Sequence, residues 1–245
     1  MCEVEDVKKS REEVRVNFFN GQLAVRSQKW HPYDGSPPNG RLPVFWNRSL
    51  GNSAPHWDEF IEAMIPYNND RRVLQKYLGS CLVHPSVGEA SHGKVLELRS
   101  ADPAGSQLIA DTMGCILGCG RESDLMACIP ANEVVFNSVR KRMWGKYLVH
   151  LTDTDAAEYP HWASQLLYLV SGADSAIRVK ALLTAPSFHP RLDELLGERL
   201  IVIDMLPMSH GNRIPSLAAE LLPERLGIIE WLLGGLFYLV AGGGL

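Results

Sequence analysis

Length, composition and charge limit the class of this protein. The chain has 245 residues, of which 46% are hydrophobic and 21% charged, and its formal net charge is −4. These values predict a globular protein with a sizeable core, built as one large domain or as a small domain plus a core domain. They exclude a globally basic surface for nucleic acid, so any DNA contact must come from a local patch. The longest apolar run, residues 226–240, contains Glu230 and is shorter than the roughly 20 residues of a membrane span, so we expect no membrane partner.

The five cysteines are expected to be reduced thiols. Their odd number, and an N-terminal segment without the features of a signal peptide, favour a cytoplasmic protein. Cys115 and Cys119 are four residues apart on a predicted helix, a spacing that suits a metal ion. No second Cys or His pair follows at the spacing of a zinc site, however. We therefore expect these thiols to pack in the core as small hydrophobic groups.

The N-terminal part of the chain is expected to form a β-hairpin followed by helices. Two apolar runs flank Asn20-Gly21, a sequence typical of a type I′ hairpin turn because both central positions of that turn need a positive φ. Helices are then predicted over residues 57–64 and 70–81. Asp70 is the expected N-cap of the second helix, whose apolar residues recur at helical spacing.

From residue 93 onward, apolar runs and amphipathic segments alternate. This alternation of strands and helices predicts a mainly parallel sheet covered on both faces. The predicted strands are residues 95–99, 147–151, 180–184 and 200–204. The predicted helices are residues 106–117, 162–170, 217–222 and 226–240.

The turn after the strand at residues 95–99 has the layout of a phosphate-binding loop. Such a loop reads G-x-x-x-x-G-K-[S/T], and its lysine and hydroxyl contact the β/γ-phosphates and Mg²⁺. Here Ser106 stands at the lysine position and Gln107 at the hydroxyl position, while Asp102 adds negative charge where phosphates would lie. The predicted cofactor-binding residues are Ser100, Gly105, Ser106 and Gln107.

A series of short motifs surrounds this loop. The first three are Asn20-Gly21-Gln22-Leu23, Leu74-Gln75-Lys76-Tyr77-Leu78-Gly79 and Trp144-Gly145-Lys146-Tyr147-Leu148-Val149. The others are Leu169-Val170-Ser171-Gly172-Ala173-Asp174, Ala185-Pro186-Ser187-Phe188-His189-Pro190, Glu198-Arg199-Leu200-Ile201 and Gly227-Ile228-Ile229-Glu230-Trp231. In this order and spacing, over about residues 14 to 240, they resemble the motifs of phage and plasmid primase–helicases, a family of superfamily 3 helicases.

The resemblance implies a fold, an activity and partners. The expected fold is α/β, with an AAA+-like P-loop core and mainly parallel sheet in residues 93–245, preceded by a β-hairpin and helical region in residues 1–92. The expected function is that of a superfamily 3 helicase-like replication protein of a phage, plasmid or other mobile element, with ATP and Mg²⁺ as cofactors. The expected partners are single-stranded or forked DNA, the other subunits of a homo- or hetero-oligomeric ring, and a primase.

The chain departs from the family pattern at several site positions. Asp153 stands where the family has a glutamate that binds the metal and polarises water; it could hold Mg²⁺, but its shorter side chain displaces it as a water activator. Ser187 replaces the sensor asparagine, and Arg199 retains an arginine that contacts phosphates in the family. Arg178 and Lys180 fall where the family has its DNA-tracking hairpin. Since losing one preorganised charge contact costs roughly 10²–10³ in rate, we expect an impaired or lost ATPase site.

Two alternatives stay open. The chain could be an active but weak DNA-dependent ATPase and helicase, or a non-enzymatic DNA-binding or regulatory subunit. Residues 140–142, Arg-Lys-Arg, form with Trp144 a basic and aromatic patch that suits a nucleic-acid backbone or a solvated helix face. His150 and His161 flank Asp153 and other acidic residues, a group that suits a metal ion or an acidic solvated loop.

Overall fold

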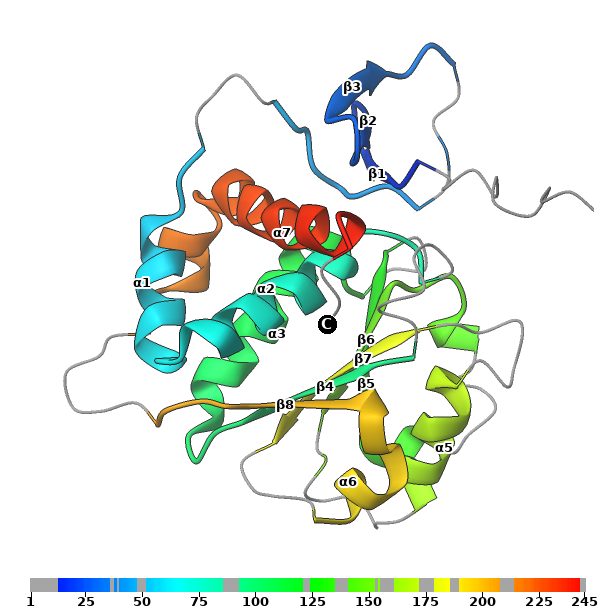
Figure 1. Cartoon of the computed structure of the whole chain (residues 1–245), viewed down its shortest axis with the longest axis vertical. Helices are drawn as coiled ribbons and strands as arrows, with labels where there is room; N and C mark the ends of the chain where they lie inside the picture. Colours follow the sequence, from blue (N-terminus) through cyan, green and yellow to red (C-terminus); the bar gives the residue numbers. More distant parts are fainter. Residues whose placement is uncertain are drawn as a thin grey trace, which may run out of the picture.

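The chain forms a small antiparallel sheet and a larger parallel sheet with helices on both faces (Figure 1). The structure is a computed structural model. It describes residues 13–35, 38, 40–47, 52–85, 93–120, 124–134, 141–152, 154, 161–171, 179–185, 190–207 and 214–242. The predicted site residues Asp153, Arg178 and Ser187 lie outside the described residues.

The small sheet confirms the predicted hairpin and adds a strand to it. Its antiparallel strands are β1 (Arg15–Phe18), β2 (Gly21–Ala24) and β3 (Lys29–Pro32), and β3 has no counterpart in the prediction. The predicted turn is wrong by one residue. Phe18 pairs with Gly21, so Phe19 and Asn20 form the turn, and Gly21 belongs to β2 without a positive φ.

Tertiary packing explains why this hairpin needs Asn20 and Gly21. A Cβ at Gly21 would overlap the Trp30 ring and lie 2.7 Å from the carbonyl oxygen of His31. The Asn20 side chain bonds both backbone groups of Trp46: Nδ2 donates to its carbonyl, and Oδ1 accepts from its N–H, each at 3.0 Å. Asn20 therefore fastens the following chain to the hairpin, a role that the turn signal does not reveal.

The large sheet contains five parallel strands. They are β4 (Val95–Arg99), β5 (Met126–Pro130), β6 (Leu148–Thr152), β7 (Lys180–Ala185) and β8 (Leu200–Asp204), in the order β5-β6-β7-β4-β8. The α/β class, the parallel sheet and four of its strands are confirmed. The edge strand β5 is missing from the prediction, because its sequence Met-Ala-Cys-Ile-Pro has one β-branched residue and ends in proline.

Helices cover both faces of this sheet (Figure 1). One face carries α1 (Pro55–Met64), α2 (Asn68–Ser80), α3 (Pro103–Leu117) and α7 (Arg225–Val240), together with a π-helical turn, η5 (Leu217–Leu221). The other face carries α5 (His161–Val170) and α6 (Pro190–Leu196). The short 3-10 turns are η3 (Ala131–Glu133) and η4 (Gly197–Arg199).

Two predicted details of the helices are wrong. Tyr67 occupies the N-cap position of α2, so Asp70 lies within the first turn and does not cap the helix. Helix α3 begins at Pro103, three residues before the predicted start. None of the helices in the described part of the chain has the length and apolar character that a membrane crossing requires.

Helices α2 and α7 cross with their backbones in contact. A Cβ at Gly79 would overlap the carbonyl oxygen of Leu232, and a Cβ at Gly235 would overlap that of Gln75. Only glycine leaves room for such a crossing. The hydrophobic cluster on this face contains side chains from both sides of the predicted division at residue 92, among them Phe18, Tyr77 and Leu232.

Candidate functional site

The connection from β4 to α3 lies at the position where open parallel sheets bind ligands. From β4 the chain crosses β7 and β6 to the edge strand β5, whereas from β7 it crosses β4 to the opposite edge strand β8. The two connections therefore leave neighbouring strand ends in opposite directions, which defines a topological switch point. Ser100 and its neighbours therefore lie at this switch point.

The connection is short, and we call it closed because a side chain of the protein itself occupies the helix end where a phosphate would bind. Only Ser100, Ala101 and Asp102 separate β4 from α3. The Asp102 carboxylate accepts a hydrogen bond from the N–H of Ala104 at 3.0 Å and so caps α3, and Pro103 at the first helical position has no N–H. A phosphate-binding loop uses such N–H groups to hold phosphate. Here a carboxylate of the protein occupies the positive end of the helix instead.

The other predicted nucleotide-binding residues serve packing and helix contacts. A Cβ at Gly105 would lie 2.5 Å from Met64 Cε, so this glycine leaves room for the end of the Met64 side chain of α1. Ser106 is fully buried, and its hydroxyl donates to the carbonyl oxygen of Pro103 at 3.0 Å. The Gln107 side chain donates to the Asp111 carboxylate, one helical turn further on, at 2.8 Å. The strand, turn and helix are confirmed, but a phosphate-binding loop is not.

Arg199 lies at the opposite end of the sheet from this connection. It immediately precedes β8, whose first residue pairs with Val95 at the start of β4. A Cβ at Gly93 would overlap the Arg199 guanidinium, which places that group beside the amino end of β4. Because a strand of five residues is roughly 16 Å long, the structure does not bring Arg199 to Ser100 within one chain.

Lys180, predicted to contact DNA, is instead fully buried. Its ammonium donates to the carbonyl oxygens of Ser80 at 2.8 Å and Val83 at 3.5 Å. Ser80 is the last residue of α2, where a cation is favourable, and Val83 lies in the turn that follows. Burial lowers the pKa of the Lys180 ammonium to about 8, and the nearby Cys81 thiol opposes this change. The lysine fastens α2 to β7 and is not accessible to DNA in this structure.

His150 is also part of the core rather than of an acidic loop. It lies in β6 with 1% of its surface exposed, and its Nε2 is 3.0 Å from the hydroxyl of Thr184. Burial lowers the pKa of the His150 imidazole to about 4, with Asp111 acting in the opposite direction, so the ring is neutral at physiological pH. Within the described ranges, no group of three or more His, Cys, Asp or Glu side chains is arranged to hold a metal ion.

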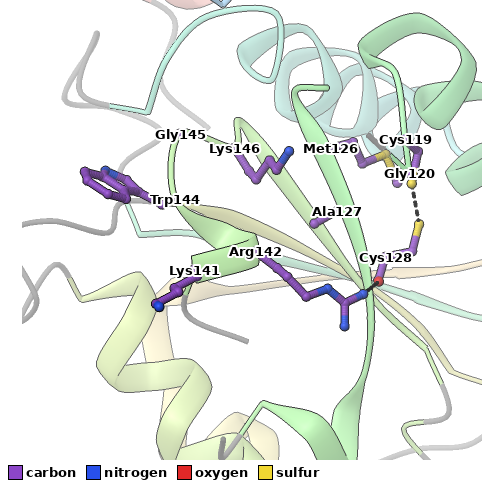
Figure 2. Close-up of a pocket in the computed structure, with 10 residues that line it drawn as sticks. All are labelled: Cys119, Gly120, Met126, Ala127, Cys128, Lys141, Arg142, Trp144, Gly145 and Lys146. Atoms are coloured by element: carbon purple, nitrogen blue, oxygen red, sulfur yellow. Dashed lines mark hydrogen bonds between the residues drawn. The ribbon is translucent and has the colours of Figure 1, made fainter. Parts of the chain in front are cut away.

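The structure contains a pocket beside the edge strand β5 that the sequence indicates only in part. It has a volume of about 590 Å³. Figure 2 shows its lining, which comes from the chain after α3, from the first residues of β5 and from the turn before β6. The lining residues are Cys119, Gly120, Met126, Ala127, Cys128, Lys141, Arg142, Trp144, Gly145 and Lys146.

The basic side chains of this pocket are anchored to different degrees. Arg142 donates to Glu133 at 3.0 Å and to the carbonyl oxygen of Cys128 at 2.9 Å, which covers part of the free edge of β5. The Lys146 ammonium donates to the carbonyl oxygen of Asp124 at 2.6 Å and is buried. Trp144 has 71% of its surface exposed. Of the predicted basic and aromatic patch, Lys141, Arg142 and Trp144 are exposed, and Arg140 lies outside the described residues. The Arg142 charge is already engaged by Glu133.

The two cysteines of the pocket correct the expectation of core packing. Cys119 and Cys128 are both exposed, whereas Cys81 is buried and Cys115 is half-buried. Their Sγ atoms are 3.1 Å apart. The sequence does not reveal this pair, since Cys128 lies on the strand that the prediction omits. A short apolar run at residues 125–129, after the glycines at 118 and 120, is the signal that could have located it.

Comparison of the chain with protein-family models, and with curated proteins, finds no match. The primase–helicase resemblance therefore rests on the order and spacing of the motifs.

Proposed function

We propose that this chain is a superfamily 3 helicase-like replication protein of a phage, plasmid or other mobile element that has lost its nucleotide site and has a structural role in a replication ring. The order of the motifs over about residues 14 to 240 supports the family. The parallel sheet also supports it, because the β4–α3 connection, where the resemblance expects the nucleotide loop, lies at the topological switch point of the sheet.

The closed β4–α3 connection is the observation that carries the loss of nucleotide binding. ATP would bring several negative charges to the N-terminus of α3, where the Asp102 carboxylate already lies and accepts the N–H of Ala104. No lysine stands at the loop position that would neutralise those charges, and Ser106 in its place is buried in the core. The residues of this connection therefore do not fit ATP with Mg²⁺.

Isothermal titration calorimetry with ATP and Mg²⁺ tests the proposal on the full chain. We expect a dissociation constant weaker than about 1 mM, equivalent to less than about 4 kcal/mol of binding free energy. Micromolar binding by the wild type would overturn the proposal. Asp102→Asn is the matched variant, since asparagine keeps the helix cap without the charge. We expect Asp102→Asn to bind ATP no better than the wild type does. A gain to micromolar affinity would show that the charge of Asp102 alone, and not the shape of the β4–α3 connection, excludes ATP.

Assembly and DNA binding separate the alternatives. Nucleotide-free rings detected by light scattering would support a structural ring subunit. Monomers that shift a single-stranded DNA probe would favour a non-enzymatic DNA-binding subunit. ATP hydrolysis that DNA stimulates, and that Asp153→Ala abolishes, would favour an active helicase with unconventional residues.

A further inference from the structure

Two thiols face each other at the edge of the large sheet. Cys119 immediately follows the C-cap of α3, and Cys128 lies in the middle of β5. Figure 2 shows their sulfur atoms directed toward one another, and the Sγ–Sγ distance is 3.1 Å. Both residues are exposed, so small molecules in solution reach them.

The backbone holds the two thiols near the geometry of a disulfide. The N–H of Leu125 donates to the carbonyl oxygen of Leu117 at 3.0 Å, and the N–H of Met126 donates to that of Gly118 at 3.1 Å. Cys119 and Met126 form a parallel bridge. This short pairing ties the end of α3 to the start of β5. Because a disulfide bond is about 2.05 Å long, the sulfur atoms need to approach by only about 1 Å.

Glycines on both sides of Cys119 allow that approach. Gly118 and Gly120 have φ values of 78° and 109°, in a region that favours glycine. Space around Gly120 is open, since a Cβ there would have no heavy atom within 4 Å. The glycines therefore give the backbone on either side of Cys119 the conformational freedom for a small adjustment, while Cys128 is held in β5.

The surroundings of the two thiols differ, and this difference bears on which of them reacts first with an oxidant. Although Cys128 is exposed at the surface, desolvation of its thiol, followed by the neighbouring Cys119, raises the pKa of Cys128 to about 12. Cys119 lies in the connection after α3 rather than in a strand, and this position suits it to attack an incoming disulfide. Lys141 lines the same pocket, and its positive charge favours an anionic oxidant such as a glutathione-type disulfide.

We propose that Cys119 and Cys128 form a reversible redox site that exchanges two electrons with low-molecular-weight disulfides. The Cys119 thiolate attacks one sulfur of the oxidant, forming a mixed disulfide and releasing the first thiolate. Cys128 then gives up its proton and attacks Cys119 Sγ, which forms the Cys119–Cys128 bond and releases the second thiolate. The oxidant gains two electrons and the two protons of the cysteines, and a reduced dithiol reverses both steps.

The redox site does not depend on the proposed function. Its disulfide would join the end of α3 covalently to the edge strand and reshape the pocket between them. Cysteines 81 and 115 are not part of it. Of these, Cys81 is fully buried, and burial raises the pKa of its thiol to about 11.

Thiol trapping in glutathione buffers tests the proposal. The reduced full chain is equilibrated at graded ratios of oxidised to reduced glutathione, alkylated, and analysed by intact mass and peptide mapping. We expect two thiols to become protected, so that the intact chain carries two fewer alkyl groups than the fully reduced chain, and a cross-link between the peptides that contain Cys119 and Cys128. Relative to a peptide of residues 117–130, the folded chain should favour its disulfide by about tenfold or more, because the fold holds the thiols together.

Three variants make the test specific. Cys119→Ser and Cys128→Ser should each abolish the two-thiol protection and leave at most a mixed disulfide with glutathione. Cys115→Ser is the matched control and should behave as the wild type. Absence of the cross-link in the folded wild type would overturn the proposal, as would its loss in Cys115→Ser or an equilibrium equal to that of the peptide.

Discussion

Replacing Lys180 with methionine should remove a pH dependence of stability that the wild type possesses. Burial lowers the pKa of the Lys180 ammonium from 10.5 to about 8, which corresponds to about 3 kcal/mol at about 1.4 kcal/mol per unit. Below about pH 8 Lys180 is protonated in both the folded and the unfolded chain, so the folded state bears the full free-energy cost of burying the charged ammonium. Between about pH 8 and pH 10.5 the unfolded chain keeps a proton that the folded chain releases, so the free energy of unfolding rises with pH.

The rise can be measured by urea denaturation in a Cys81→Ala background, which removes the neighbouring thiol. From about pH 7 to pH 9, the free energy of unfolding with Lys180 present should increase by at least about 1 kcal/mol more than that of Lys180→Met. Lys29→Met, at an exposed lysine of β3, is the control and should show no such difference. If the background protein and its Lys180→Met variant change in parallel over this range, the assignment of a buried ammonium is refuted.

Two further predictions concern the packing of α1 and α7. Gly235→Ala should destabilise the protein by about 1–3 kcal/mol in denaturant titrations, because its Cβ would overlap the Gln75 backbone. Gly234→Ala is the neighbouring control, since its Cβ would meet only the end of the Gln75 side chain at 3.1 Å, and equal losses in both variants would contradict the close crossing. Glu224→Ala should cost about 0.5–2 kcal/mol, because this carboxylate accepts first-turn N–H groups of α1 at 3.1 and 3.2 Å. Glu224→Gln keeps an acceptor and should retain most of that stability; a loss as large as in Glu224→Ala would show that the cap is not the cause.

Local sequence patterns predict most elements of the large sheet. Val95–Arg99 and Leu200–Asp204 are short apolar runs with sharp boundaries, and the strands match these boundaries. Strand β5 escapes prediction because pairing with β6, and the contact of residues 117–119 with its start, stabilise a segment of weak intrinsic preference. Asp70 and Asn20 show the same limit of prediction from local sequence. A capping or turn residue can be recognised from its neighbours in the chain, but the group that its side chain contacts depends on the tertiary structure.

The sequence by itself determined an α/β chain with a parallel sheet, and it located the β4–α3 turn at the carboxyl end of a strand of that sheet. It did so because strand and helix periodicities are local properties. Only the tertiary structure decided that Asp102 closes that turn, that Ser106 and Lys180 are buried, and that Cys119 meets Cys128. These outcomes depend on which helix or strand packs against each side chain, and contacts between distant segments leave no periodic signal in the chain.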